Sequence, residues 1–160
     1  MELTKINFKP SFFSDRPIEL LSDGEFSAVA FRYETGVCGL KIRNKNCNMV
    51  VLPYMGQQIW FAEFHGKNLT QKSIFDQPQN TTKFGDNYGG LLIHCGLTNI
   101  NCADEGEDYP LHGELPFAYY PDTYVGIGRD EKGKYLVVGG TYVYRNSQEY
   151  HYSYSPQLRL

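Results

Sequence analysis

The segment with the most suggestive chemistry is residues 110–116 (PLHGELP), which places His112 between two prolines. Proline stiffens the flanks of a loop, and Gly113 would let the backbone approach a ligand closely. Glu114 adds a carboxylate two residues after the histidine. A histidine near a carboxylate in a rigid loop can serve as a general acid or hydrogen-bond donor, although it can also be a loop histidine bonded to the backbone.

His94 is the second histidine of interest, because it follows the apolar run 91–93 (LLI). That run predicts a short buried strand, and a side chain at the end of a stiff strand is held at a rim that ligands can reach. A ligand contact and a satisfied structural histidine are equally good interpretations of this position. His65 precedes a glycine turn and His151 lies between two tyrosines, so we interpret both as structural or solvent-facing.

The sequence lacks the recognised spacings of metal and cofactor motifs. Residues of the types that zinc accepts occur at His94, Cys95, Cys102 and His112. Their spacing matches neither CxxC nor HxxxH, and the acidic run 104–108 (DEGED) lacks the register of a calcium loop. The sequence has no GxSxG elbow, no phosphate-binding glycine loop and no GxGxxG fingerprint after a strand. We therefore expect no metal and no organic cofactor.

Aromatic residues make up 15% of the chain and accompany several amide side chains. Sugars present apolar C–H faces and hydroxyl edges, which suit flat aromatic faces beside amides and histidines. The alternative is a tyrosine-rich sheet core. The candidate platforms and amides are Trp60, Tyr88, Tyr119, Tyr120, Gln57, Gln58 and Asn87. Among the amides, we predict that Gln57 and Asn87 contact the substrate.

The composition predicts a folded β-protein. The 160 residues, 41% apolar and 21% charged, fit one globular domain. Tyrosine and phenylalanine favour strands, and 16 glycines with 8 prolines supply turns. A net charge of −3 without a basic cluster argues against a nucleic-acid groove.

The chain shows neither an export signal nor a run of about 18 apolar residues, so we expect no membrane association. Its four cysteines, without an export signal, are interpreted as reduced thiols. Together these features predict a cytoplasmic protein.

Short apolar and aromatic segments separated by turn residues predict a meandering antiparallel sheet. The expected strands are residues 26–33, 37–43, 48–53, 58–64, 123–128, 134–144 and 150–154. Two irregular segments, 70–90 and 98–116, interrupt them, and loops of this length are usually functional or mobile. The two-residue period of a strand places alternate tyrosines on one face, namely Tyr142 with Tyr144, then Tyr150, Tyr152 and Tyr154.

The two ends of the chain differ from this pattern. Residues 1–24 predict an arm whose phenylalanines and leucines pack on a body formed by residues 25–160. Residues 155–160 (SPQLRL) look like the beginning of a strand, so we expect the body to be the N-terminal part of a longer domain. An unpaired strand edge there would favour self-association into a homo-oligomer.

Several segments together resemble a known family. Residues 52–60 (LPYMGQQIW) and 66–69 (GKNL) are similar to an early segment of aldose 1-epimerase-related proteins. Residues 89–97 (GGLLIHCGL), followed by 110–116, are more specific. The chain from about residue 25 onward resembles a little-characterised, aldose 1-epimerase-related branch of the galactose mutarotase-like superfamily.

That resemblance implies an all-β fold, an antiparallel β-sandwich of the mutarotase type with a concave sheet that binds a monosaccharide or sugar derivative. Mutarotases of the family open and reclose the sugar ring: a carboxylate base takes the anomeric proton and a histidine donates to the ring oxygen. His112 stands in the Leu-His-Gly context of the first family histidine, which implies that it binds and polarises the sugar. The predicted substrate contacts beside it are His94, Glu114, Asn87 and Gln57.

The chain also departs from the family. Nothing in it matches the segments that carry the second family histidine and the base, and Glu114 cannot replace that base because it shares one short motif with His112. We therefore expect this chain alone to show weak or absent mutarotation. The alternatives are a non-catalytic sugar-binding module of the same fold, and a cupin-like metal-dependent sugar isomerase that uses His94 and His112.

Overall fold

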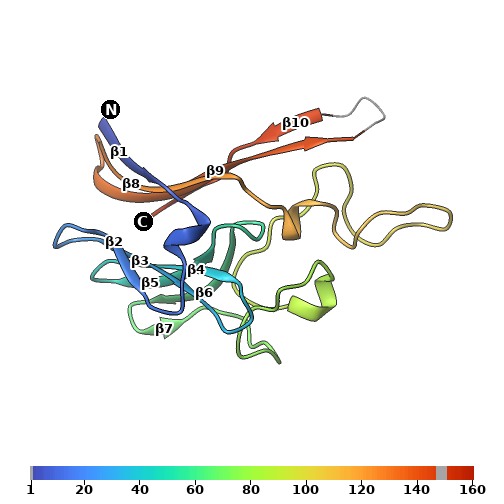
Figure 1. Ribbon diagram of the computed structural model, residues 1–160, viewed down its shortest axis with the longest axis horizontal. Coiled ribbons are helices and arrows are strands. Elements are labelled where there is room, and N and C mark those ends of the chain that lie inside the picture. The colour runs from blue at the N-terminus through green and yellow to red at the C-terminus, as the bar shows by residue number, and fades with distance from the viewer. Residues whose placement is uncertain (1, 147–150) are drawn as a thin grey trace.

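Two antiparallel β-sheets, stacked face to face, form the body of the computed structural model, which describes residues 2–146 and 151–160 (Figure 1). One sheet has six strands in sequence order: β2 (Ile18–Ser22), β3 (Ser27–Arg32), β4 (Cys38–Arg43), β5 (Cys47–Leu52), β6 (Gln58–Phe64) and β7 (Lys67–Asn68). The other has five: β1 (Glu2–Asn7), β8 (Asp122–Asp130), β9 (Gly133–Arg145), β10 (His151–Tyr154) and β11 (Gln157–Arg159). The predicted all-β antiparallel sandwich is confirmed.

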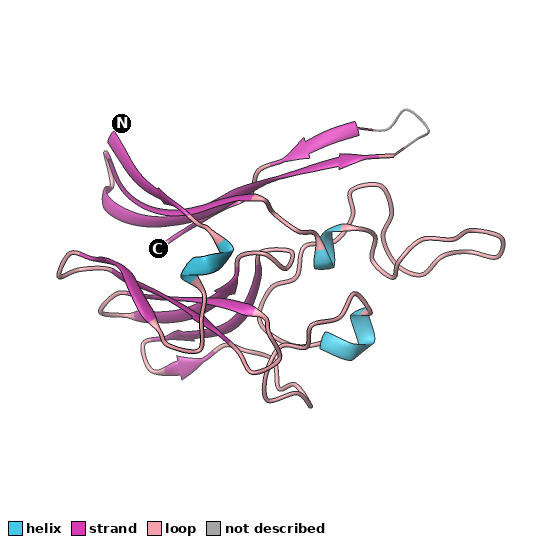
Figure 2. Ribbon diagram, viewed as in Figure 1, coloured by secondary structure: helices cyan, strands magenta, loops and turns pink. Residues whose placement is uncertain are grey.

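Helical structure within the described residues is limited to three short 3₁₀ turns, drawn in cyan in Figure 2. They are η1 (Pro10–Phe12), η2 (Phe84–Asn87) and η3 (Leu115–Phe117). No helix in this part of the chain is long and apolar enough to cross a membrane.

The hydrophobic core lies between the sheets, and in some strands burial alternates with the two-residue period of a strand. In β3, Ala28 and Ala30 are buried while the residues between and beside them are not. Leu136 and Val138 of β9, in the other sheet, are also buried and belong to the same cluster. Burying one large apolar side chain contributes about 1.5–3 kcal/mol. The main cluster contains Phe8, Phe13, Phe26, Ala28, Ala30, Leu40, Ile42, Val51, Val125, Leu136 and Val138.

The first 24 residues, predicted as an arm that packs on the body, do place aromatic side chains in the core. Phe8 and Phe13 are buried, with their ring centroids 5.5 Å apart in an edge-to-face arrangement. The same segment also supplies an edge strand to each sheet, because β1 pairs with β8 and β2 pairs with β3. The chain thus crosses between the sheets through η1 before the meander begins.

Residues 91–93 do not form the buried strand that their apolar character predicts. Leu91 and Leu92 are 43% and 40% exposed, and the segment touches β6 through a single isolated bridge between Leu92 and Ile59. The positive φ angles of the preceding Gly89 and Gly90, 156° and 82°, turn the chain just before this contact. The prediction failed because three apolar residues look alike whether they enter a sheet or cross its end.

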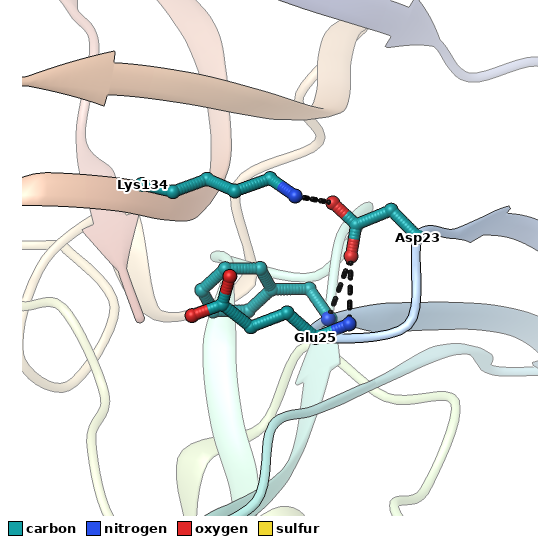
Figure 3. A network of polar contacts seen from close by, with 4 residues as sticks. Asp23, Glu25 and Lys134 are labelled. Carbon is teal, nitrogen blue, oxygen red and sulfur yellow. Dashed lines mark hydrogen bonds and ion pairs between the residues drawn. The ribbon is translucent and has the colours of Figure 1, made fainter.

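An ion pair links the two sheets at the turn after β2. Asp23 Oδ2 lies 2.5 Å from Lys134 Nζ at the start of β9, and Asp23 Oδ1 accepts hydrogen bonds from the backbone N–H groups of Glu25 and Phe26 (Figure 3). The hydrogen bond from Lys134, followed by that from the Phe26 N–H, lowers the pKa of Asp23 from 3.8 to about 2.

We expect Asp23→Asn to lower the free energy of unfolding at neutral pH by about 0.5–1 kcal/mol, because the pair is close to solvent and screened. Asparagine keeps an oxygen acceptor for the two backbone N–H groups, so the variant removes mainly the charge. Because the folded-state pKa is depressed, the wild-type advantage is present above pH 3.8 and is lost as the pH falls through about 2. Urea titrations at several pH values measure the free energy of unfolding of the wild type and the variant. Lys134→Met should show the same loss at neutral pH. A difference between the wild type and Asp23→Asn that does not change with pH would contradict the ion pair.

Candidate functional site

The segment around His112 pairs with the segment around Gly96 through the backbone. The Gly96 N–H donates to His112 O at 2.9 Å, and the Leu115 N–H donates to Gly96 O at 3.1 Å. The His112 N–H in turn donates to Asn101 O at 2.9 Å. These bonds bring the two predicted site segments, 94–97 and 112–115, side by side. We call these two segments the loop pair.

Gly113 is required by this pairing rather than by a ligand. Its φ is 82°, and a Cβ at this position would lie 2.3 Å from the carbonyl oxygen of Asn99 and 3.2 Å from Gly96 Cα. The close backbone approach predicted at Gly113 therefore exists, but the neighbour in the structure is the protein's own loop. His112 also has a positive φ, of 64°, which is unusual for a residue with a side chain.

Glu114 joins three segments through its carboxylate. Oε1 accepts hydrogen bonds from the Leu97 N–H at 2.7 Å, from the Thr98 N–H at 3.2 Å, and from the Tyr152 hydroxyl. Oε2 accepts the Thr98 hydroxyl at 2.6 Å. Partial burial would raise the pKa of Glu114, but the hydrogen bonds from Thr98 and Tyr152 outweigh it, so the pKa lies below its ordinary 4.5.

The hairpin of β9 and β10 presents tyrosines to this loop pair. Tyr142 and Tyr144 are opposite Tyr154 and Tyr152, which confirms the predicted alternation for these four residues; Tyr150 lies outside the described residues. The rings of Tyr144 and Tyr152 are stacked, with centroids 5.2 Å apart and planes 21° apart. Leu115, Ala118 and Tyr120 pack against the inner part of the same face.

His94 is held against this hairpin. Its Nδ1 lies 3.1 Å from the Tyr154 hydroxyl, within hydrogen-bond distance, and the two rings meet edge to face with centroids 5.6 Å apart. Burial lowers the pKa of His94 below 6.5, which keeps the imidazole neutral at pH 7. A neutral imidazole so placed retains Nε2 for a second polar contact.

The imidazole of His112 contacts a different segment. It meets the ring of Phe84 edge to face, with centroids 4.5 Å apart, and Phe84 in turn lies 5.5 Å from Tyr88. No hydrogen bond to the imidazole is found within residues 2–146 and 151–160. The backbone N–H and C=O of His112 are both hydrogen-bonded, to Asn101 and Gly96 respectively.

The two predicted amides are buried inside the protein. Gln57 is 6% exposed and its Nε2 donates to Thr123 Oγ1 at 3.2 Å. Asn87 is 1% exposed; its Oδ1 accepts the Gln79 N–H at 2.7 Å and its Nδ2 lies 3.5 Å from Gln58 Oε1. Both side chains thus join neighbouring segments, and their hydrogen bonds found among the described residues go to groups other than His94, His112 and Glu114.

A groove of about 500 Å³ opens between the loop pair and the hairpin. One wall carries the stacked tyrosines, and the other carries a hydroxyl and an amide. Its lining residues are Leu97, Thr98, Asn99, Tyr144, Asn146, His151 and Tyr152. Glu114 lies beside it through its bonds to Thr98 and Tyr152, whereas His112 is not a lining residue.

Sequence reasoning missed most of these lining residues. The tyrosine alternation in β9 and β10 was visible, but a period of two only groups side chains by face and does not identify the partner of that face. Thr98 and Asn99 carried no signal beyond their place in an irregular segment. His151, interpreted as structural or solvent-facing, is exposed and lines the groove.

No group of three or more His, Cys, Asp or Glu side chains suited to a metal occurs in 2–146 or 151–160. All four cysteines are free thiols; Cys95 and Cys102 are exposed, and Cys47 is buried.

No family model and no curated protein sequence matches the chain. A solved structure does match its fold: a protein from Klebsiella pneumoniae subsp. pneumoniae MGH 78578 described as a "putative aldose 1-epimerase", with a TM-score of 0.79 and 14% sequence identity. The match covers 99% of this chain and 48% of that chain, so this chain spans about half the length of the matched protein. At this identity the likeness establishes the fold, a mutarotase-like β-sandwich.

Proposed function

We propose that this protein is a carbohydrate-binding protein of the mutarotase-like fold and that a monosaccharide or sugar derivative binds in the groove beside Glu114. The observation that carries the proposal is the groove itself, which is lined both by the stacked rings of Tyr144 and Tyr152 and by the polar side chains of Thr98 and Asn99. A pyranose needs an apolar platform for its C–H face and donors and acceptors for its hydroxyls, and the two walls supply them separately.

In this proposal the predicted contacts have different tasks. Glu114 already accepts four hydrogen bonds, so it positions Thr98 and Tyr152 rather than serving as a free base. His94 orients Tyr154 on the same hairpin face. His112 stays our predicted catalytic or polarising residue, at the Phe84 side of the loop pair.

We expect Tyr144→Ala to weaken monosaccharide binding roughly tenfold, equivalent to about 1.4 kcal/mol, because the apolar platform loses one of its two rings. Saturation-transfer NMR and titration calorimetry with common aldohexoses and aldopentoses measure it. Val143→Ala, on the opposite face of the same strand, is the matched control and should bind as the wild type does. If His112→Ala weakens binding and Tyr144→Ala does not, the sugar lies at the Phe84 side and the groove assignment is wrong.

A second candidate function is an aldose 1-epimerase-like isomerase that opens and recloses the sugar ring by acid–base chemistry. The fold likeness to the Klebsiella protein favours it. Because the carboxylate of Glu114 is engaged, we expect this chain to bind sugar with weak or absent anomer exchange. NMR exchange spectroscopy between α and β anomers distinguishes the isomerase from a non-catalytic sugar-binding module. Anomer exchange that is lost in His112→Ala would establish the isomerase, and sugar binding without anomer exchange would establish the binding module.

A further inference from the structure

The strands β10 and β11 form one continuous edge of the five-stranded sheet. β10 pairs with β9 from His151 opposite Arg145 to Tyr154 opposite Tyr142, and β11 continues in the same register with Gln157 opposite Gly139. The hydroxyls of Ser155 and Thr141, 3.0 Å apart, lie on this register line between them. The interruption falls at Pro156, which has no N–H to donate to β9.

The register determines which backbone groups of this edge face outward. Leu160 exchanges both backbone hydrogen bonds with Leu136, at 2.9 and 3.0 Å, so even-numbered residues turn their N–H and C=O towards β9. Odd-numbered residues therefore turn theirs away from the sheet. Within the described part of the chain, no strand pairs with this outer side, and none of its outward residues is a proline: Ser153, Ser155, Gln157 and Arg159.

The other sheet edges carry features that oppose pairing with another strand. β7 has only two residues, β2 contains a register shift between Glu19 and Leu21, and β1 has Lys5 near its centre. Residues 151–160 contain no lysine and no register shift. The guanidinium of Arg159 is held inside its own chain, 3.6 Å from Asp130 and over the ring of Tyr135.

We propose that two copies of this chain associate through this edge, with residues 151–159 of each copy paired antiparallel about a two-fold axis at Ser155. In this register the outward backbone N–H and C=O groups of each odd-numbered residue lie opposite those of an odd-numbered residue of the second copy. The exposed polar face then matches itself, with Ser153 opposite Gln157 of the second copy. The half-buried face also matches itself, with Tyr152 opposite Leu158 and Tyr154 opposite Pro156.

This pairing does not depend on the proposed sugar site, because it uses the backbone of the outer edge. Pro156 does not obstruct it, since the position of its missing N–H faces β9 in each copy. The two five-stranded sheets become one sheet that continues across the two-fold axis, which removes the unpaired edge from both copies.

Sedimentation velocity from micromolar to high-micromolar protein tests the proposal. We expect a monomer–dimer equilibrium in the wild type, and at least a roughly tenfold weaker dimer in Ser155→Pro, which removes the outward N–H at the two-fold axis and no backbone bond to β9. Ser155→Ala is the matched control: it loses the hydroxyl contact with Thr141 but keeps the N–H, so its dimer should match the wild type.

Amide hydrogen exchange followed by NMR keeps the test independent of how Ser155→Pro folds. In the wild type, the N–H groups of Ser153, Ser155 and Gln157 should become protected as concentration rises, whereas that of Leu158 should be protected at all concentrations. A wild type that stays monomeric, or one that dimerises without this alternating protection, would overturn the proposal.

Discussion

Replacing Gly113 with alanine is expected to lower the free energy of unfolding by about 2–4 kcal/mol. The new Cβ would stand 2.3 Å from the carbonyl oxygen of Asn99, a backbone atom that cannot rotate away. Moving the loop to relieve the clash would break the bonds of His112 to Gly96 and to Asn101. Urea unfolding followed by fluorescence and circular dichroism gives the value.

Gly106→Ala is the matched control for that experiment. Gly106 lies in the same loop with a similar φ, 90° against 82° at Gly113, but a Cβ there would meet nothing within 4 Å. It should show only the cost of the left-handed conformation, about 1–2 kcal/mol. Equal losses in the two variants would mean that the loops do not approach as closely as the structure shows.

Removing the carboxylate of Glu114 is expected to destabilise the protein by about 2 kcal/mol, because Glu114→Ala leaves two backbone N–H groups and two hydroxyls without their acceptor. Glu114→Gln keeps an oxygen acceptor and should lose less. Since the folded-state pKa of Glu114 is depressed, its contribution is present above pH 4.5 and is lost as the pH falls through that lowered value. In Glu114→Ala, the free energy of unfolding should no longer contain this contribution to its fall at acid pH.

Glu107→Ala provides the comparison, because Glu107 lies in the same irregular segment and its carboxylate accepts one exposed hydrogen bond, from the Asp104 N–H at 3.2 Å. We expect a change within about 0.5 kcal/mol there. Chemical unfolding from acid to neutral pH measures all three variants. Should Glu114→Ala and Glu107→Ala be indistinguishable, the bonds to Thr98 and Tyr152 would have no role in joining the loop to the hairpin.

The antiparallel strands were predictable because their signals are local. Alternating burial in β3 and turn residues between short segments can be recognised within a window of about ten residues. The N-terminal segment was harder, since pairing of β1 with β8 joins residues more than a hundred positions apart, such as Lys5 and Gly126. No local pattern encodes a partner at that separation.

The candidate site was predictable only in part. Residues 110–116 do lie beside the His94 segment, and their histidine keeps an imidazole without a hydrogen bond among the described residues. The roles of Gln57 and Asn87 could not be derived, because an amide beside aromatic residues has the same sequence whether it faces a ligand or, as here, joins buried segments. Their burial depends on which elements pack over them.

By itself, the sequence determined the β-class and most strand positions, because residue type and period act over short distances. Only the tertiary structure decided what these residues contact. It placed the loop of Asn99 against Gly113, gave Glu114 donors from two other segments, and left the edge of β10 and β11 unpaired among the described strands. Each outcome depends on packing between segments that are distant in sequence, where long-range contacts rather than local preferences decide the free energy.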